Sequence, residues 1–180
     1  MTLEEYQRTP ETVLPQELIY GNVRVADAPF VGHQRVVFQL ARALDDLVRA
    51  EALGEVLVAP VDVVLDGPRA LVLQPDIVFV SRERRQIILD RIHGAPDLVV
   101  EILSPKPRIG SLHERLHWFA EYGVREVWLY HQLEKRLDIA ACELGRVVSV
   151  TSFAARESPR SEVLPPFRRP MASVLAAYLA

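Results

Sequence analysis

The stretch DLVVEIL at residues 97–103 decides the fold, because it is a nearly continuous apolar run with one carboxylate, Glu101, inside it. A run of this kind is typical of a β-strand that is buried on both faces of a sheet. The next four residues read SPKP, and the prolines end the strand because proline has no backbone N–H to donate. We therefore place this strand at the centre of the predicted sheet.

The residues upstream of this strand predict a hairpin followed by a long helix. Residues 17–25 read as two short strands around a Gly-Asn turn. Residues 32–51 carry apolar residues at spacings of three and four, which predicts an amphipathic helix. Gly54 follows directly and is expected to close this helix.

Between that helix and the central strand, the sequence predicts a second hairpin. Residues 55–65 and 71–80 are rich in Val and Leu, and they flank the turn sequence DGP at 66–68. We expect two long, paired strands here. The charged residues 82–93 predict a loop or a short helix, whose arginines form a solvated face or, alternatively, grip a phosphate backbone.

Downstream of the central strand, a helix is predicted over residues 111–122, with Ser111 and Glu114 as its capping box. Residues 126–131 predict a strand, and residues 136–153 a late hairpin around Gly145. The tail from Pro170 to Ala180 predicts a small closing helix. The order of elements indicates an α/β fold with a mixed central sheet flanked by helices, and with extra N-terminal and C-terminal β-hairpins.

Composition limits the class of protein. The 180 residues are 49% hydrophobic and 25% charged, which predicts one globular domain over residues 1–180. A formal net charge of −3 argues against a general polyanion binder. Cys142 is the single cysteine, so no internal disulfide is possible and a cytoplasmic location is expected. The N-terminus lacks the apolar core of a signal peptide, and no apolar run is long enough to span a membrane.

Two carboxylates stand where apolar residues are expected. Glu101 interrupts the central strand, and Asp76 follows Gln74 and Pro75 in the preceding strand pattern. A buried carboxylate needs a cation, hydrogen-bond donors or a raised pKa, because burying the bare charge is very costly. A site for a hard cation, Mg²⁺ or Mn²⁺, satisfies both carboxylates. A structural salt bridge to one of the arginines does so equally well, and the spacing leaves both interpretations open.

Three motifs then suggest a family. They are QPD at residues 74–76, PDLVVEILSP at residues 96–105, and YGVREVW at residues 122–128. Together they resemble the family of Uma-type "putative restriction endonucleases" in the PD-(D/E)XK nuclease-like superfamily. Weaker matches extend the resemblance over nearly the whole chain, at residues 2–6, Glu17, Gly21, His33 and residues 164–166.

The resemblance implies a restriction-endonuclease-like αβββαβ core and a metal-dependent site that cleaves phosphodiester bonds. Asp76 matches the aspartate of the PD motif, and Glu101 matches the acidic residue of the next strand. The resemblance therefore implies that both ligate Mg²⁺ or Mn²⁺, with the carbonyl of Ile102 as a further oxygen ligand. Arg115 or Lys106 is expected to stabilise charge on the phosphorus.

The sequence departs from the family pattern at three positions. The family usually carries an aspartate and, four residues later, a lysine on the helix after the central strand; these positions are Ser111 and Arg115 here. The aspartate that usually follows the YGVREVW strand is His131. An arginine stays charged and cannot take the proton-transfer role of a lysine, although it can clamp a phosphate. A weakened or lost active site is therefore a second interpretation.

Further residues are accessory candidates. Glu17 adds a metal or water contact, or is an exposed hairpin residue. His33 lies on the apolar stripe of its helix, so it is either a satisfied core histidine or a substrate contact. Gln74 shares a strand face with Asp76.

These observations give a leading hypothesis of a metal-dependent endonuclease that acts on DNA as a homodimer or higher homo-oligomer. The late hairpin and the C-terminal helix are the expected interface. The alternative is a nuclease-derived module that binds nucleic acid or a protein partner without turnover. A purely structural oligomer is the third reading. These three hypotheses can be distinguished by whether Asp76 and Glu101 lie close enough together to share a cation.

Overall fold

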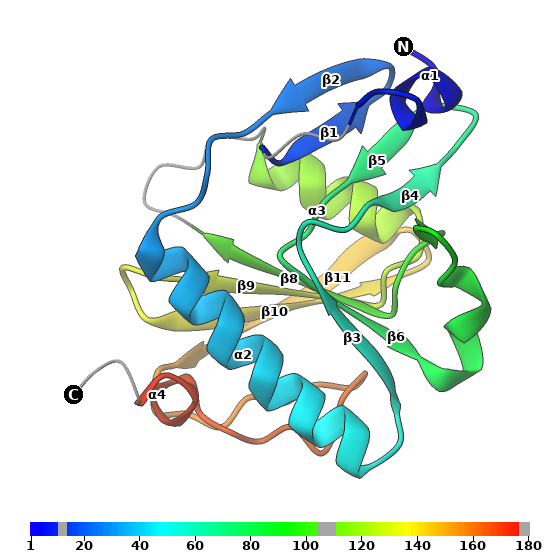
Figure 1. Cartoon of the computed structure of the whole chain (residues 1–180). Coiled ribbons are helices and arrows are strands. Elements are labelled where there is room, and N and C mark those ends of the chain that lie inside the picture. Colours follow the sequence, from blue (N-terminus) through cyan, green and yellow to red (C-terminus); the bar gives the residue numbers. More distant parts are fainter. Residues whose placement is uncertain (11–13, 104–110, 177–180) are drawn as a thin grey trace.

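The computed structural model describes residues 1–10, 14–103 and 111–176. Its strands form two sheets (Figure 1). The small sheet has the order β2-β1-β5-β4-β7, and the large sheet has the order β11-β10-β9-β8-β6-β3. Their elements are α1 (Leu3–Gln7), β1 (Gln16–Ile19), β2 (Asn22–Val25), α2 (Val31–Ala50), β3 (Gly54–Val58), β4 (Val63–Asp66), β5 (Leu71–Leu73), β6 (Ile77–Ser81), the 3-10 helix η1 (Arg82–Ile87), β7 (Ile92–His93), β8 (Leu98–Leu103), α3 (Leu112–Glu121), β9 (Glu126–His131), β10 (Arg136–Glu143), β11 (Arg146–Ala154) and α4 (Met171–Val174).

Strand β8 lies in the interior of the large sheet, as its apolar sequence predicts. It pairs antiparallel with β6 on one side and parallel with β9 on the other, so the sheet is mixed. Leu98, Val99 and Val100 are fully buried. The predicted α/β fold with a mixed sheet and flanking helices is therefore confirmed.

Helices cover the two faces of the large sheet. Helix α2 packs Leu40 and Leu44 against one face, together with Val100 of β8. Helix α3 packs Phe119 against the other face, in a cluster that includes Val99 and residues of the small sheet. Val99 and Val100 therefore point to opposite faces, as the two-residue period of a strand requires. Figure 1 shows α2 on one side of the large sheet, with α3 and the small sheet on the other.

The predicted hairpin of two long strands is wrong, because each long strand is broken in two. The first predicted strand, residues 55–65, is divided into β3 and β4, and the second, residues 71–80, into β5 and β6. Strands β4 and β5 pair in the small sheet, whereas β3 and β6 pair in the large one. Prolines stand at both breaks, Pro60 and Pro75, where the missing N–H interrupts a ladder. The chain therefore crosses between the sheets twice within a short stretch.

Gly54 also differs from its predicted role. Helix α2 ends at Ala50, and Gly54 begins β3 beside Val80 of β6. A Cβ atom on Gly54 would lie 2.1 Å from the carbonyl oxygen of Val80, which no side chain permits. The glycine is therefore required by the close approach of two strands.

The remaining predicted elements are confirmed with small changes of boundary. Helix α3 has the Ser111–Glu114 capping box, and β10 and β11 form the late hairpin. The closing helix is the short α4, while residues 177–180 of the predicted tail lie outside the described residues. None of the helices in the described part of the chain has the length and apolar character that a membrane crossing requires.

Candidate active site

Asp76 and Glu101 lie close together where β6 meets β8. Strands β6 and β8 are antiparallel, and the last residue pair between them is Ile77 with Val100. Asp76 directly precedes β6, and its carboxylate accepts a hydrogen bond from the backbone N–H of Ile102, the residue that follows Glu101 in β8. The two carboxylates therefore share one environment at this end of the strand pair.

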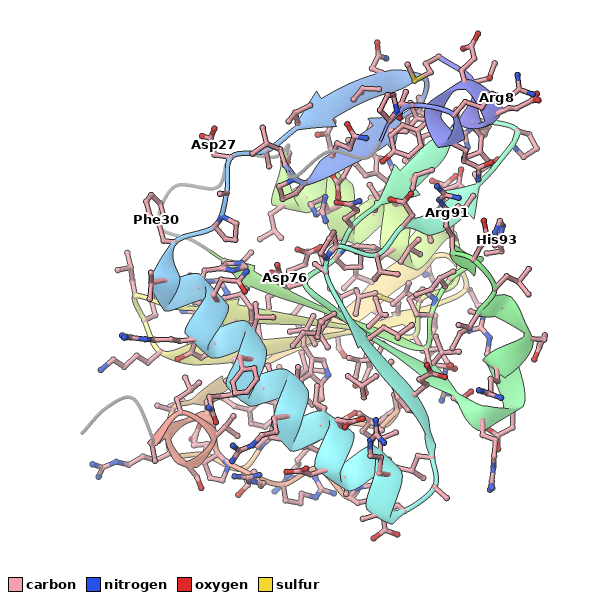
Figure 2. The ribbon with its side chains drawn as sticks, in the orientation of Figure 1. Arg8, Asp27, Phe30, Asp76, Arg91 and His93 are labelled. Atoms are coloured by element: carbon pink, nitrogen blue, oxygen red, sulfur yellow. The ribbon has the colours of Figure 1, made fainter. Side chains whose placement is uncertain are left out.

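Asp76 is held by two hydrogen bonds to the same carboxylate oxygen. The backbone N–H of Ile102 donates to Asp76 Oδ2 over 2.7 Å, and His33 Nε2 lies 3.2 Å from it. Figure 2 shows Asp76 beside the first turn of α2, which carries His33. Pro75 frees this residue from regular strand pairing. The side chain is thus fixed by the next strand and by a helix from the other side.

His33 is buried, and its two ring nitrogens differ in their surroundings. Nε2 contacts Asp76, whereas Nδ1 has no hydrogen-bond partner among the described residues. Burial lowers the pKa of His33, but the hydrogen bond and charge of Asp76, with the charge of Glu101, raise it above the ordinary value overall. The imidazole is therefore part of the carboxylate environment and not a fully satisfied core histidine.

Glu101 is held by a guanidinium. Arg115 of α3 donates to Glu101 Oε1 from Nε over 3.1 Å and from Nη2 over 2.6 Å. Its Nη1 donates to both oxygens of Glu17, over 2.8 and 2.7 Å. Arg115 is 7% exposed and Glu17 is fully buried. The guanidinium thus bridges β1 of the small sheet and β8 of the large sheet.

The charges of this cluster do not balance. Among the described residues, Asp76, Glu101 and Glu17 bring three carboxylates to a region with one guanidinium, that of Arg115, and one imidazole, that of His33. Burial raises the pKa of Glu101 to about 7, and the charges of Asp76 and Glu17 act in the same direction while Arg115 opposes them. Burial lowers the pKa of Arg115, but the charges of Glu101 and Glu17 raise it by more. The pKa therefore lies above its ordinary value, and the guanidinium stays cationic. The excess negative charge is what a bound cation would relieve.

The donor set suits a hard cation that keeps water ligands. Asp76 Oδ1 and Glu101 Oε2 accept no hydrogen bond from the described residues, so each carboxylate keeps one oxygen for another partner. Among residues 1–10, 14–103 and 111–176, no three His, Cys, Asp or Glu side chains group closely enough to hold a metal ion by themselves. Mg²⁺ is commonly held by only one or two carboxylates with several waters, so this sparse set fits it.

Glu17 also connects to the segment between β5 and β6, which carries Asp76. The backbone N–H of Gln74 donates to Glu17 Oε1 over 2.8 Å. The side chain of Gln74 accepts from the N–H of Gln16 and donates to Asp62. Asp62 is paired in turn with Arg91, 2.9 Å away. Glu17 therefore touches the supports of both candidate ligands, and it is buried, so the expectation of an exposed hairpin residue is wrong.

The structure brings together most of the residues that the sequence singles out. His33 and Asp76 form one hydrogen-bonded group with the amide of Ile102, and Gln74, Glu17 and Glu101 form a second through Arg115; the two groups meet at the peptide bond between Glu101 and Ile102. Arg115 belongs to the second group, but its guanidinium is engaged by two carboxylates. Lys106 lies outside the described residues.

Two departures from the family pattern have structural roles. Ser111 caps α3, and its side chain accepts from the backbone of Glu114. His131 lies at the end of β9, where its Nε2 is 2.8 Å from Asp138 Oδ2. Arg136 also pairs with Asp138. Both residues are therefore bound in local networks of their own.

The bridge from Glu17 through Arg115 to Glu101 is the feature that sequence reasoning missed. One signal was present: Arg115 lies three residues after Leu112 and four before Phe119, on the inner stripe of its helix. A charged residue on that stripe needs a buried partner of opposite charge. The identity of that partner, Glu17, depends on the packing of the two sheets.

Comparisons with known proteins identify a family and a fold. The model of a family described as "Putative restriction endonuclease", Uma2, matches residues 3–172. Among solved structures, a putative nuclease belonging to DUF820 from Anabaena variabilis ATCC 29413 is similar to this chain, with a TM-score of 0.81 and 17% sequence identity over 98% of each chain. At that identity the similarity establishes the fold. A search of curated proteins found no match.

Proposed function

Because this chain belongs to the Uma2 family of putative restriction endonucleases, we propose that it is a metal-dependent endonuclease that hydrolyses phosphodiester bonds of DNA. One observation supports the proposal: Asp76 is hydrogen-bonded to the backbone N–H of the residue that follows Glu101, and each of the two carboxylates has an oxygen for which the described residues supply no hydrogen bond. The surrounding excess of negative charge supports a cation at this place. The fold shared with a nuclease is consistent with it.

In this proposal Asp76 and Glu101 hold Mg²⁺ or Mn²⁺, and the carbonyl of Ile102 supplies a further oxygen. The bound ion would activate a water molecule and polarise the scissile phosphate. The protein's own residues hold the ligands in place. Ile102 N–H and His33 orient Asp76, and Arg115 orients Glu101.

The role that we propose for Arg115 is narrower than direct contact with phosphate. Its Nε, Nη1 and Nη2 atoms all donate to Glu17 or Glu101, and the side chain is buried. An arginine in this position offers little to a substrate. We therefore assign it the positioning of Glu101, with Glu17 as the support that fixes the guanidinium. Lys106 remains the candidate for contact with the phosphate.

The test is a plasmid-nicking assay with titrated Mg²⁺ and Mn²⁺. Asp76→Asn and Glu101→Gln should each abolish metal-dependent nicking, since each removes a charged ligand and keeps the shape of the side chain. The matched control is Asp45→Asn, which removes a surface carboxylate on α2 that pairs with Arg49. Nicking that survives unchanged in both site variants would refute the proposal and indicate a contaminating nuclease.

A second candidate function rests on the same guanidinium. Arg115 stands where the family usually has lysine and is neutralised by two carboxylates, so the second candidate is a nuclease-derived module that binds nucleic acid without turnover. This candidate predicts salt-sensitive binding without cleavage in either metal. Appearance of cleavage in Arg115→Lys, with none in the wild-type protein, would favour it over the leading proposal.

A further inference from the structure

Strand β11 is an open edge of the large sheet. It pairs with β10 on one side, and in the part of the chain that the structure describes no strand lies on its other side. Residues 148–152 are all exposed, so both faces of the strand are uncovered there. In the strand order of the large sheet, β11 and β3 are the two opposite ends. The opposite edge, β3, is half-buried for most of its length, with α2 and η1 packed beside it.

The sequence of β11 lacks most of the devices that protect open edges. Residues 147–155 read VVSVTSFAA, without a charge, a proline or a glycine. Native proteins usually place such residues on exposed edges, because free N–H and C=O groups are a template for another strand. A bulge near Cys142 distorts the start of β11 but leaves residues 149–154 in regular register with β10. At the end of the strand, the backbone N–H and carbonyl of Ala154 are hydrogen-bonded to Glu157, so the regular, uncharged stretch with an open edge is Ser149–Phe153.

We propose that β11 is the interface at which a second copy of this chain adds its own β11, antiparallel, to make one continuous sheet across a two-fold axis. The regular stretch from Ser149 to Phe153 has Thr151 at its middle. Pairing about Thr151 sets Val150 against Ser152 of the other copy. Within Ser149–Phe153 no charged residues meet, and Val150, which is 55% exposed, gains cover.

A second copy fits this edge better than an unrelated strand does. A two-fold contact pairs the same surface on both copies, so one interface removes the open edge of each. Pairing of β11 with the opposite edge of another copy would build a fibre instead. That route is closed because β3 is short, half-buried and flanked by α2 and η1. The assembly therefore ends at two copies.

The first test is the mass in solution by sedimentation velocity at several concentrations. The 20.3-kDa chain should sediment as a particle of twice that mass. Val150→Lys with Thr151→Lys should give a monomer with an unchanged far-UV circular dichroism spectrum. Val58→Lys is the matched control, since Val58 is 46% exposed on the opposite edge and should leave the dimer intact. A wild-type protein that is monomeric throughout, or a dimer that survives the double substitution, would overturn the proposal.

The second test is cross-linking by single cysteines, and it does not depend on destabilising the dimer. Opposite residues of an antiparallel pair have Cα atoms about 4.5–5.5 Å apart, within the range that a disulfide spans. Thr151→Cys should therefore give a covalent dimer on mild oxidation. Leu144→Cys, at a 95% exposed hairpin tip, should not, and the native Cys142 is buried. Equal cross-linking at positions 144 and 151 would indicate random collision and would contradict the interface.

Discussion

Arg115 Nη1 and Glu17 Oε2 lie 2.7 Å apart, although 98 residues separate them in the chain. This contact joins helix α3 to the small sheet, and the same guanidinium reaches Glu101 in the large sheet. The two sheets and the helix between them are thus linked through one buried cation. The stability of the fold and the geometry of the candidate site consequently depend on the same side chain.

Replacement of Arg115 by methionine should destabilise the protein strongly. The substitution leaves Glu17 and Glu101 buried without a cation, and removing one partner of a buried ion pair costs about 3–5 kcal/mol. Urea unfolding followed by circular dichroism measures the loss. Arg49→Met is the matched control, because Arg49 forms an exposed pair with Asp45 on α2, and a change within about 0.5 kcal/mol is expected. Similar losses of unfolding free energy in both variants would show that the buried ion pairs of Arg115 stabilise the fold no more than an exposed pair does.

Divalent metal should stabilise the folded protein. A ligand that binds only the native state adds about 2.7 kcal/mol at a concentration one hundred times its Kd. Addition of Mg²⁺ or Mn²⁺ should therefore raise the melting temperature of the wild-type protein, and Asp76→Asn should remove this increase. Calorimetry with and without EDTA makes the comparison. An increase of equal size in the variant would place the metal elsewhere.

The stability of the metal-free protein should fall as the pH rises towards 7. Burial raises the pKa of Glu101 from 4.5 to about 7, so the native state holds a proton that the unfolded state has released. The stabilisation from this group is complete below pH 4.5 and is lost as the pH rises to about 7, by up to about 1.4 kcal/mol per pH unit. His33, whose pKa is also raised, acts in the same direction above pH 6.5.

Urea titrations in EDTA at several pH values, on the wild-type protein and Glu101→Gln, isolate this contribution. The glutamine variant should lose the part of the pH dependence between 4.5 and 7. Parallel curves for the two proteins would mean that Glu101 is ionised in the native state at all these pH values.

Gly54→Ala should be strongly destabilising, whereas Gly32→Ala should not. At Gly54 the added methyl group would meet the Val80 carbonyl oxygen at 2.1 Å, so a strand must shift, at a cost of about 1–3 kcal/mol or more. At Gly32 in α2 the nearest atom is the side-chain oxygen of Gln132 at 3.7 Å, which is ordinary contact. Alanine there favours the helix by up to about 1 kcal/mol. Thermal melts of both variants test the contrast.

Much of the fold could be predicted from the sequence because its central elements carry strong local patterns. The apolar run of β8 and the spacing of apolar residues in α2 each specify one structure at a short range. The capping box of α3 marks its first turn in the same way. Breaks in long strands are different: Val-rich segments on both sides of Pro60 and Pro75 look continuous, although the chain changes sheet there. The β-propensity of a segment indicates that its backbone is extended, but it does not indicate which strand the segment pairs with.

The two carboxylates of the candidate site could be singled out from the sequence, whereas the residues that support them could not. A carboxylate inside an apolar strand is visible in the sequence, as Glu101 shows. Its partner is a matter of three-dimensional packing, so the bridge to Glu17 could not be read from spacing. Glu126 gives a second example, because this buried strand residue accepts hydrogen bonds from Ser161 and from the backbone at Glu162 and Val163. Such contacts join segments that no local pattern relates.

Arg115 is synthesised after the three carboxylates that surround it in the folded protein. Asp76 and Glu101 leave the ribosome before Arg115, as does Glu17. A nascent polypeptide that stops short of α3 therefore holds its acidic groups without the guanidinium that lets them approach. Truncated translation products should consequently fail to assemble the candidate site, which would form only in chains that have been synthesised past that helix.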